Sequence, residues 1–161
     1  MSMTSDTRDT SAGRSRREWL AVLAHAPRES LQRLAGAILT QSFDCLREPE
    51  TGLAMLRARI GNGGDRFNLG EATLTRCVVR HRGAQGAVTA GIGYVLGRDA
   101  ERAGWVARFD ALLQQPEQHE ALMRDVIEPL RAATAERRAE KQARTDASRV
   151  QFFTLQPEAS T

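Results

Sequence analysis

The first forty residues place apolar and polar positions with the period of an α-helix. Ser15 and Glu18 have the spacing of a capping box, and the apolar positions from Trp19 onward predict a helix that runs to about Ala24. Pro27 favours the first turn of a second helix, in which apolar residues recur every three or four positions. The two segments together predict a short helical hairpin.

From Ser42 the period changes to two, which is the period of a β-strand. The alternation predicts four strands, over residues 43–47, 53–60, 72–82 and 88–96, with turns at 48–52 and 83–86. Because the connections are turns or one loop rather than helices, we expect an antiparallel meander with helices packed on one face. Gly91 and Gly93 lie on one face of the last strand, and this bare face predicts a helix packed closely against it.

The carboxy-terminal third predicts three helical segments. Asp99 caps the first, and its internal Gly104 predicts a close crossing with another element. Pro116 opens the second, which Pro129 kinks or divides. Residues 131–149 carry an alanine at every third or fourth position among charges, so they predict a long helix that buries little apolar area.

An apolar tail, Val150–Leu155, follows this helix and holds two of the five phenylalanines in the chain. It is either a last strand on the edge of the sheet or an arm that reaches into another subunit, and the residues alone leave both interpretations open. In the second case Arg149, Val150, Phe152 and Phe153 are the interface residues. The predicted fold is therefore α+β, with a four-stranded antiparallel sheet, or a five-stranded one where the tail is a last strand. The predicted organisation is a disordered lead over 1–13, an α+β domain over 14–130, and a helical arm with an apolar tail over 131–161.

Composition limits the class of protein. A chain of 161 residues is most economically one domain with ragged ends. The longest apolar run, Trp19–Ala24, is far shorter than the roughly 20 residues that span a bilayer, and residues 1–13 have no apolar block of the kind found in a signal peptide. We therefore expect a cytoplasmic protein that does not enter a membrane.

Neither the charge distribution nor the cysteines and histidines indicate a binding site. Residues 131–149 hold six basic and three acidic residues, which equals the net charge of +3 for the whole chain, so nucleic-acid binding would depend on one segment without clustered aromatic residues. Cys45 and Cys77 form no CxxC pair and are expected to be reduced residues of the core. The three histidines lack any metal-binding spacing, and no metal site is predicted.

The stretch between the second and third predicted strands is the richest in candidate chemistry. Residues 61–70 hold four glycines in ten positions, together with Asp65 and Arg66. Glycine N–H groups, hydroxyls and arginines together can hold an oxyanion such as a phosphate group. Arg76 and Arg98, further along the chain, are candidates for the same site. The alternative is a long hairpin connection, which accumulates the same residue types to turn the chain. Neither a Walker sequence nor a GxGxxG sequence is present.

Several separated blocks of residues form a recognisable series. The blocks are Glu50–Leu53, Gly64–Phe67 with Gly70–Arg76, Gly93–Tyr94 with Gly97–Asp99, and Ala147–Val150 with Phe152–Thr154. Over roughly residues 16–155 the chain resembles the PhnG family, which is the G subunit of the bacterial carbon-phosphorus lyase core complex.

The resemblance implies an assembly with H, I and J subunits in phosphonate utilisation and a functional link to the L protein. With H, I and L, the G subunit supports a displacement on ATP in which phosphonate replaces adenine at the anomeric carbon of ribose. Methylphosphonate then gives α-D-ribose 1-methylphosphonate 5-triphosphate. The radical iron-sulfur step belongs to the J subunit, and the two cysteines here cannot hold a four-cysteine cluster. We expect no cofactor on this chain, with MgATP as a substrate of the complex.

Such a displacement needs groups that position the triphosphate with its metal, and an acid that protonates the leaving base. The sequence offers Asp65, Arg66, Arg76 and Arg98 for the first task and no well-placed pair for the second. The leading hypothesis is a required, non-catalytic subunit, with the chemistry carried by the I subunit. The alternatives are a glycine loop that contributes directly to a shared active site, and a nucleic-acid-binding α+β module that uses the basic helix.

Overall fold

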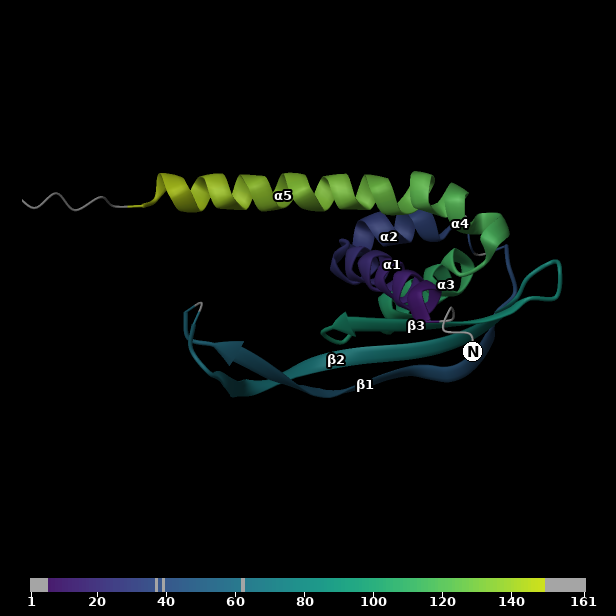
Figure 1. Cartoon of the computed structure of the whole chain (residues 1–161), viewed down its shortest axis with the longest axis horizontal. Coiled ribbons are helices and arrows are strands. Elements are labelled where there is room, and N and C mark those ends of the chain that lie inside the picture. The colour runs from purple at the N-terminus through teal and green to yellow at the C-terminus, as the bar shows by residue number, and fades with distance from the viewer. Residues whose placement is uncertain (1–5, 37, 39, 62, 150–161) are drawn as a thin grey trace, which may run out of the picture.

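The computed structural model describes residues 6–36, 38, 40–61 and 63–149, which form a three-stranded sheet with helices on one face (Figure 1). The strands are antiparallel and lie in chain order: β1 (Asp44–Arg59), β2 (Arg66–Arg82) and β3 (Val88–Leu96). The helices are α1 (Asp6–His25), α2 (Arg28–Ala35), α3 (Ala100–Leu113), α4 (Pro116–Leu122) and α5 (Glu128–Ala147), with a π-helical turn, η1 (Met123–Ile127), before α5. The α+β class and the antiparallel sheet are confirmed.

The sheet has three strands where the sequence predicts four, because the first two predicted strands are one. Residues 48–52, predicted as a turn, lie inside β1, where Thr51 pairs with Thr75 of β2. Register shifts on either side of Arg47 absorb the extra residues as bulges. Pro49 has no N–H to donate, and an edge strand tolerates that loss. The predicted strand in the apolar tail lies outside the described residues.

β2 begins earlier than predicted. Arg59 pairs with Arg66, so the connection between β1 and β2 consists of residues 60–65 alone. Gly61 lies in this connection with a φ of +62°, in the left-handed region that favours glycine. The hairpin interpretation of the glycine stretch is therefore confirmed for these residues, while residues 66–71 belong to the strand.

α1 begins at Asp6, so residues 6–13, predicted as part of a disordered lead, are helical. Ser15 and Glu18 lie inside the helix rather than at its start. The second half of α1 is anchored by Trp19 and Leu23, which are 6% and 0% exposed. Extending an existing helix costs far less than nucleating a new one, which accounts for the polar first half of α1.

α3 packs directly on β2 and β3, as the bare face of β3 predicts. A Cβ atom added at Gly91 would lie 1.9 Å from the carbonyl oxygen of Ala107, and one at Gly93 would lie 2.0 Å from that of Ala103. Only glycine leaves room for the helix backbone here. The Asp99 carboxylate accepts a hydrogen bond from the Arg102 N–H, which confirms the predicted cap of α3.

One buried carboxylate joins α3 to α1 and to β3. The Asp110 side chain is 0% exposed and accepts hydrogen bonds from the Trp19 indole N–H at 2.9 Å and from the Ile92 backbone N–H at 2.9 Å. The Arg16 guanidinium donates to both of its oxygens, at 3.1 and 2.6 Å. α1 and β3 are thus fixed against α3 by polar contacts as well as by the apolar core.

The predicted long carboxy-terminal helix is confirmed as α5, and it leaves the body of the protein. Pro116 stands at the start of α4, as expected, and Pro129 lies in the first turn of α5 directly after η1. Leu130 is the one buried residue that the structure describes in α5, and the helix then projects beyond α1 and α2 (Figure 1). None of the described helices has the length and apolarity that crossing a membrane requires.

Candidate functional site

The β1–β2 hairpin extends well beyond the end of β3. β1 and β2 pair from Asp44↔Arg80 to Arg59↔Arg66, whereas β3 pairs only with residues 74–82 of β2. A two-stranded hairpin is therefore formed by residues 53–61 and 63–73. We call it the hairpin arm. Figure 1 shows this arm and α5 projecting in the same direction past the helices.

The hairpin arm exposes apolar side chains on both of its faces. The large apolar residues of the arm are each 40% to 76% exposed to solvent. They are Leu53, Met55, Leu56, Ile60, Phe67 and Leu69. Leu53 and Met55 lie on the same face of the sheet as the one that the helices cover further along. Leu56 lies on the opposite face, since side chains alternate along a strand. Exposed apolar surface of this kind marks a protein contact site.

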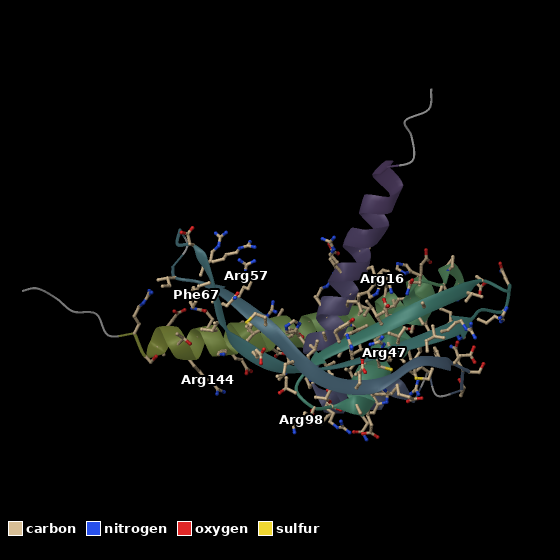
Figure 2. The ribbon with its side chains drawn as sticks, turned by 90° about the horizontal axis from the view of Figure 1, so that it is seen from below. Arg16, Arg47, Arg57, Phe67, Arg98 and Arg144 are labelled. Atoms are coloured by element: carbon tan, nitrogen blue, oxygen red, sulfur yellow. The ribbon has the colours of Figure 1, made fainter. Side chains whose placement is uncertain are left out.

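The arm also carries an arginine cluster: Arg57, Arg59 and Arg66. Arg59 and Arg66 are directly paired across the two strands, so their side chains share a face, and Arg57 lies on the same face two residues from Arg59. These three arginines make no ion pair with any residue that the structure describes. Figure 2 shows Arg57 and Phe67 at the distal end of the arm, at the same end of the molecule as Arg144 of α5.

The structure does not bring the four sequence-predicted substrate residues together. Asp65 and Arg66 lie at the turn of the arm, while Arg76 lies ten residues further along β2, roughly 33 Å away in an extended strand. Arg76 donates a hydrogen bond to the Glu50 carboxylate at 2.5 Å, and this contact lowers the pKa of Glu50. Arg98 is exposed in the connection between β3 and α3. No single phosphate group could touch all of these side chains.

The predicted interface residues are only partly described. Arg149 is exposed just after the end of α5, and its backbone N–H donates to the Asp146 carbonyl. Val150, Phe152 and Phe153 lie outside the described residues.

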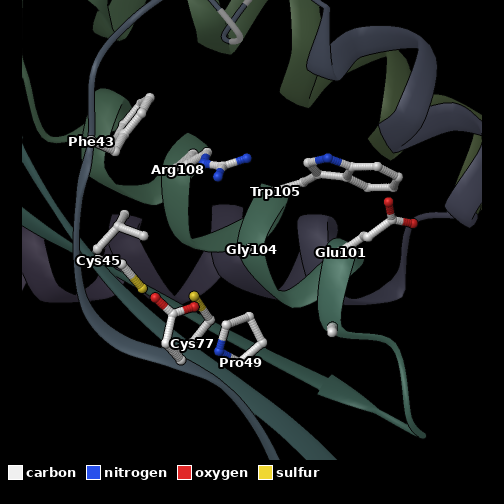
Figure 3. Close-up of a pocket in the computed structure, with 11 residues that line it drawn as sticks. Phe43, Cys45, Pro49, Cys77, Glu101, Gly104, Trp105 and Arg108 are labelled. Atoms are coloured by element: carbon white, nitrogen blue, oxygen red, sulfur yellow. The ribbon is translucent and has the colours of Figure 1, made fainter.

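A groove of about 490 Å³ lies between α3 and the start of the β1–β2 pair (Figure 3). Its floor includes Gly104, where an added Cβ atom would meet nothing within 4 Å. The predicted close crossing at Gly104 is therefore wrong, and the missing side chain instead opens the groove. Trp105 and Arg108 line the groove from α3, and Figure 3 shows both beside it.

The two cysteines also line this groove. Cys77 is buried as predicted, but Cys45 is exposed, because β1 is the edge strand and bulges beside it. Burial, together with the adjacent Cys45, raises the pKa of the Cys77 thiol to about 11. Burial, followed by Glu48, also raises the pKa of Cys45. Both thiols are therefore protonated and poorly nucleophilic at neutral pH.

Sequence reasoning missed both the groove and the exposed arm. The sequence did contain an indication of the arm. From Leu53 to Ile60, apolar residues occupy both odd and even positions, which is unusual for a strand with one solvated face. For metals, no three His, Cys, Asp or Glu side chains gather in a suitable arrangement within the part of the chain that the structure describes.

Comparison with known proteins identifies the family. Residues 14–156 match the family model described as "Phosphonate metabolism protein PhnG". The chain is also 39% identical over 150 residues to the alpha-D-ribose 1-methylphosphonate 5-triphosphate synthase subunit PhnG of Rhizobium meliloti (strain 1021), a match that covers 92% of this chain and 93% of that protein. The chain therefore belongs to the PhnG family of phosphonate metabolism proteins.

Proposed function

We propose that this chain is the G subunit of an alpha-D-ribose 1-methylphosphonate 5-triphosphate synthase in phosphonate catabolism. In this function it supports transfer of the ribose 5-triphosphate group of ATP to methylphosphonate, with release of adenine. The observation that carries the proposal is the similarity to a synthase subunit along nearly the whole length of both chains. The exposed arm and the projecting α5 support it, because both are surfaces suited to contact with other subunits.

The chain acts in the complex without supplying the catalytic groups. Adenine needs an acid for its departure, and such an acid must stand within hydrogen-bond reach of the base. The described histidines instead bond to carbonyls of their own chain: His25 to Ala21, His81 to Ser42 and His119 to Leu113. The arginines that the sequence offers for the triphosphate lie at separate places on the surface. These positions support a structural role for the chain, with the chemistry carried by the I subunit.

The partners in this proposal are the H, I and J subunits of the carbon-phosphorus lyase core complex, together with the L protein. MgATP is a substrate of the complex and not a ligand held by this chain alone. The cytoplasm is the compartment in which these partners and ATP meet.

The proposal is tested by measuring adenine release from MgATP and methylphosphonate. The purified chain alone is expected to release none, the chain together with the H, I and L proteins is expected to release adenine, and omission of the chain is expected to abolish the reaction. Adenine release by the rigorously purified chain alone would contradict the non-catalytic role. No loss of activity on omission of the chain would contradict membership of the synthase.

The alternative in which Arg66 or Arg76 reaches a phosphate of the substrate makes a different prediction. Replacing either arginine with alanine would then lower the activity of the assembled complex while leaving its subunit content unchanged. Dissociation of the complex, or normal activity, would exclude this direct role. The variant Arg76→Ala also removes the ion pair with Glu50, so its assembly and stability have to be measured beside its activity.

A further inference from the structure

The three-stranded sheet has open edges, and two of them are protected over part of their length. On the outer edge of β3, the Ala90 carbonyl accepts hydrogen bonds from Arg16 and Gln114, and the Ile92 N–H donates to Asp110. On the outer edge of β1, two bulges and Pro49 interrupt the row of backbone groups between Cys45 and Glu50, while residues 50–59 continue without a bulge. Bulges, proline and side chains that bond to the edge all make the pairing of another strand there less favourable.

Among the described residues, a third edge holds no proline and no side chain that bonds to its backbone, and its one irregularity is Leu69, which has no partner in β1 between Asn68 and Gly70. β3 ends at Leu96, and residues 66–73 of β2 continue beyond it, which leaves their backbone open on the side where β3 would have paired. We call residues 66–73 the open edge of β2. At the carboxy-terminal end of this edge, the Gly97 N–H donates a hydrogen bond to the Thr73 carbonyl at 2.9 Å. Among the described residues, no other backbone group bonds to it from that side.

The direction of the backbone groups follows from the contact at Thr73. Successive residues of an antiparallel strand direct their N–H and C=O groups to opposite sides. Since the Thr73 carbonyl is directed to the side of β3, the N–H and C=O of Glu71 are directed there too, while those of Ala72 are directed to Ala54 of β1. Glu71 therefore offers one donor and one acceptor to an incoming strand.

The side chains around the open edge favour a segment that is both apolar and acidic. Phe67, Leu69 and Leu96, at 40%, 62% and 61% exposure, offer apolar contacts. The arginine cluster places like charges directly opposite each other in the pair Arg59↔Arg66, which destabilises an isolated hairpin. Carboxylates from another chain would neutralise this cluster and turn a repulsive pair into an attractive contact.

We propose that the open edge of β2 accepts an extended segment of another subunit of the synthase, which adds a strand beside residues 66–73 and directs carboxylates to the arginine cluster. This inference rests on the proposed function, because the other subunits supply the segment. A strand of six to eight residues fits, with a length of roughly 20–27 Å. The mode of contact is β-strand addition, in which backbone hydrogen bonds give affinity and alternate side chains give specificity.

Two other occupants fit the chemistry less well. The tail of this chain, Val150–Leu155, has no carboxylate in that segment to meet the arginine cluster. A second copy of the chain, paired through the same edge about a two-fold axis, would bring a second arginine cluster toward the first. The charge of the edge thus selects a different, acidic chain.

Residue-resolved hydrogen exchange tests the added strand, with Ala72 as the internal control. In the full-length chain alone, the Glu71 amide is expected to exchange freely, and in the complex with the H, I and J subunits it should slow by about 100-fold or more. The Ala72 amide, already paired with β1, should be slow in both states. Unchanged exchange at Glu71 in an assembled complex overturns the proposal. Slow exchange at Glu71 in the chain alone also overturns it, because the tail or a second copy would then occupy the edge.

Charge reversal provides a second test. Arg66→Glu is expected to weaken association with the other subunits by about tenfold or more, because it repels the incoming carboxylates. The control is Arg82→Glu, at the exposed far end of β2, which is expected to assemble as the unchanged chain does. Arg66→Glu should not lower the thermal midpoint of the isolated chain, since it replaces a repulsive cross-strand pair with an attractive one.

The two proposals fail in distinguishable ways. If the unchanged chain does not associate with the H, I and J subunits at all, the proposed function fails. If it associates and both charge-reversed variants associate equally well, the proposed function stands and the added strand is excluded.

Discussion

Replacing Gly91 with alanine tests whether the close approach of α3 to the sheet governs the stability of this chain. The added Cβ atom would lie 1.9 Å from the Ala107 carbonyl oxygen, 2.6 Å from the Ala111 nitrogen and 2.8 Å from the Ala111 Cβ. Contacts below 3.0 Å are essentially never seen for a Cβ atom, so α3 has to retreat by more than about 1 Å. Backbone atoms of a helix cannot move aside as a flexible side chain does.

The cost of this retreat follows from what α3 buries. Ten residues of α3 are buried, and a gap of about 1 Å forfeits a quarter to a half of the attraction between the atoms on either side. Overpacking a core ordinarily costs about 1–3 kcal/mol, and we expect Gly91→Ala to cost about 3 kcal/mol or more. For a chain of this size that lowers the thermal midpoint by about 6–12 °C.

Thermal unfolding followed by circular dichroism measures the effect, and Gly52→Ala is the matched control. Gly52 lies in β1 of the same sheet, and a Cβ atom there meets nothing within 4 Å. Its replacement should leave the midpoint unchanged or raise it, since glycine inside a strand costs roughly 0.5–1 kcal/mol relative to alanine. The reasoning is refuted if Gly91→Ala unfolds within about 2 °C of the unchanged protein, or if the two variants lose equal stability.

Four further predictions address other parts of the chain. Asp110→Ala leaves buried indole and backbone N–H groups without an acceptor and should cost about 3–5 kcal/mol in urea unfolding; a loss below about 1 kcal/mol would contradict the role of this carboxylate. Iodoacetamide at pH 8 should label Cys45 before Cys77, which is buried with its pKa raised to about 11, and equal labelling of the folded chain would disagree. Partial burial raises the pKa of Asp99, but hydrogen bonds from Arg28 and from the backbone outweigh it and lower the pKa overall. Asp99→Ala should therefore cost about 1 kcal/mol at pH 7, and the difference from the unchanged chain should vanish as the pH falls below 3.8 and through the lowered pKa. Truncation after Leu130 should leave the thermal midpoint nearly unchanged and abolish association with the other subunits; co-purification of the truncated chain with those subunits would refute this.

The elements that sequence predicts well are those fixed by local rules. The Asp99 cap depends on one side chain and the N–H groups next to it, and Pro116 depends on its own ring. The paired glycines of β3 were informative because their spacing places both on one face, whatever packs against that face. For the cap and the proline the deciding interaction lies within a few residues of the signal, and for the glycines the spacing alone fixes the shared face.

The errors arose where tertiary pairing overrides local preference. Pro49 and Gly52 are good turn residues, yet β2 offers a long partner, and the chain continues through them with bulges instead of turning. The same extension of β2 separated Arg66 from Arg76, which a longer loop would have left close together. The groove at Gly104 was not predictable, since a glycine in a helix signals equally a close contact or an open space.

The division of the chain into a buried core and two projecting elements supports the proposal that its function depends on assembly with other subunits. A two-stranded hairpin is marginally stable by itself, and a helix in a protein takes most of its stability from packing against other elements. In this chain no residue of the described hairpin arm is buried, and in α5 the burial ends with Leu130. The core formed by α3 and the sheet buries no residue of the described arm and, in α5, none beyond Leu130, so further stability of both elements has to come from contacts outside this core. Because both project in the same direction (Figure 1), a partner that covers the open edge of β2 lies on the side of the protein toward which α5 extends, and one assembly step can stabilise both elements.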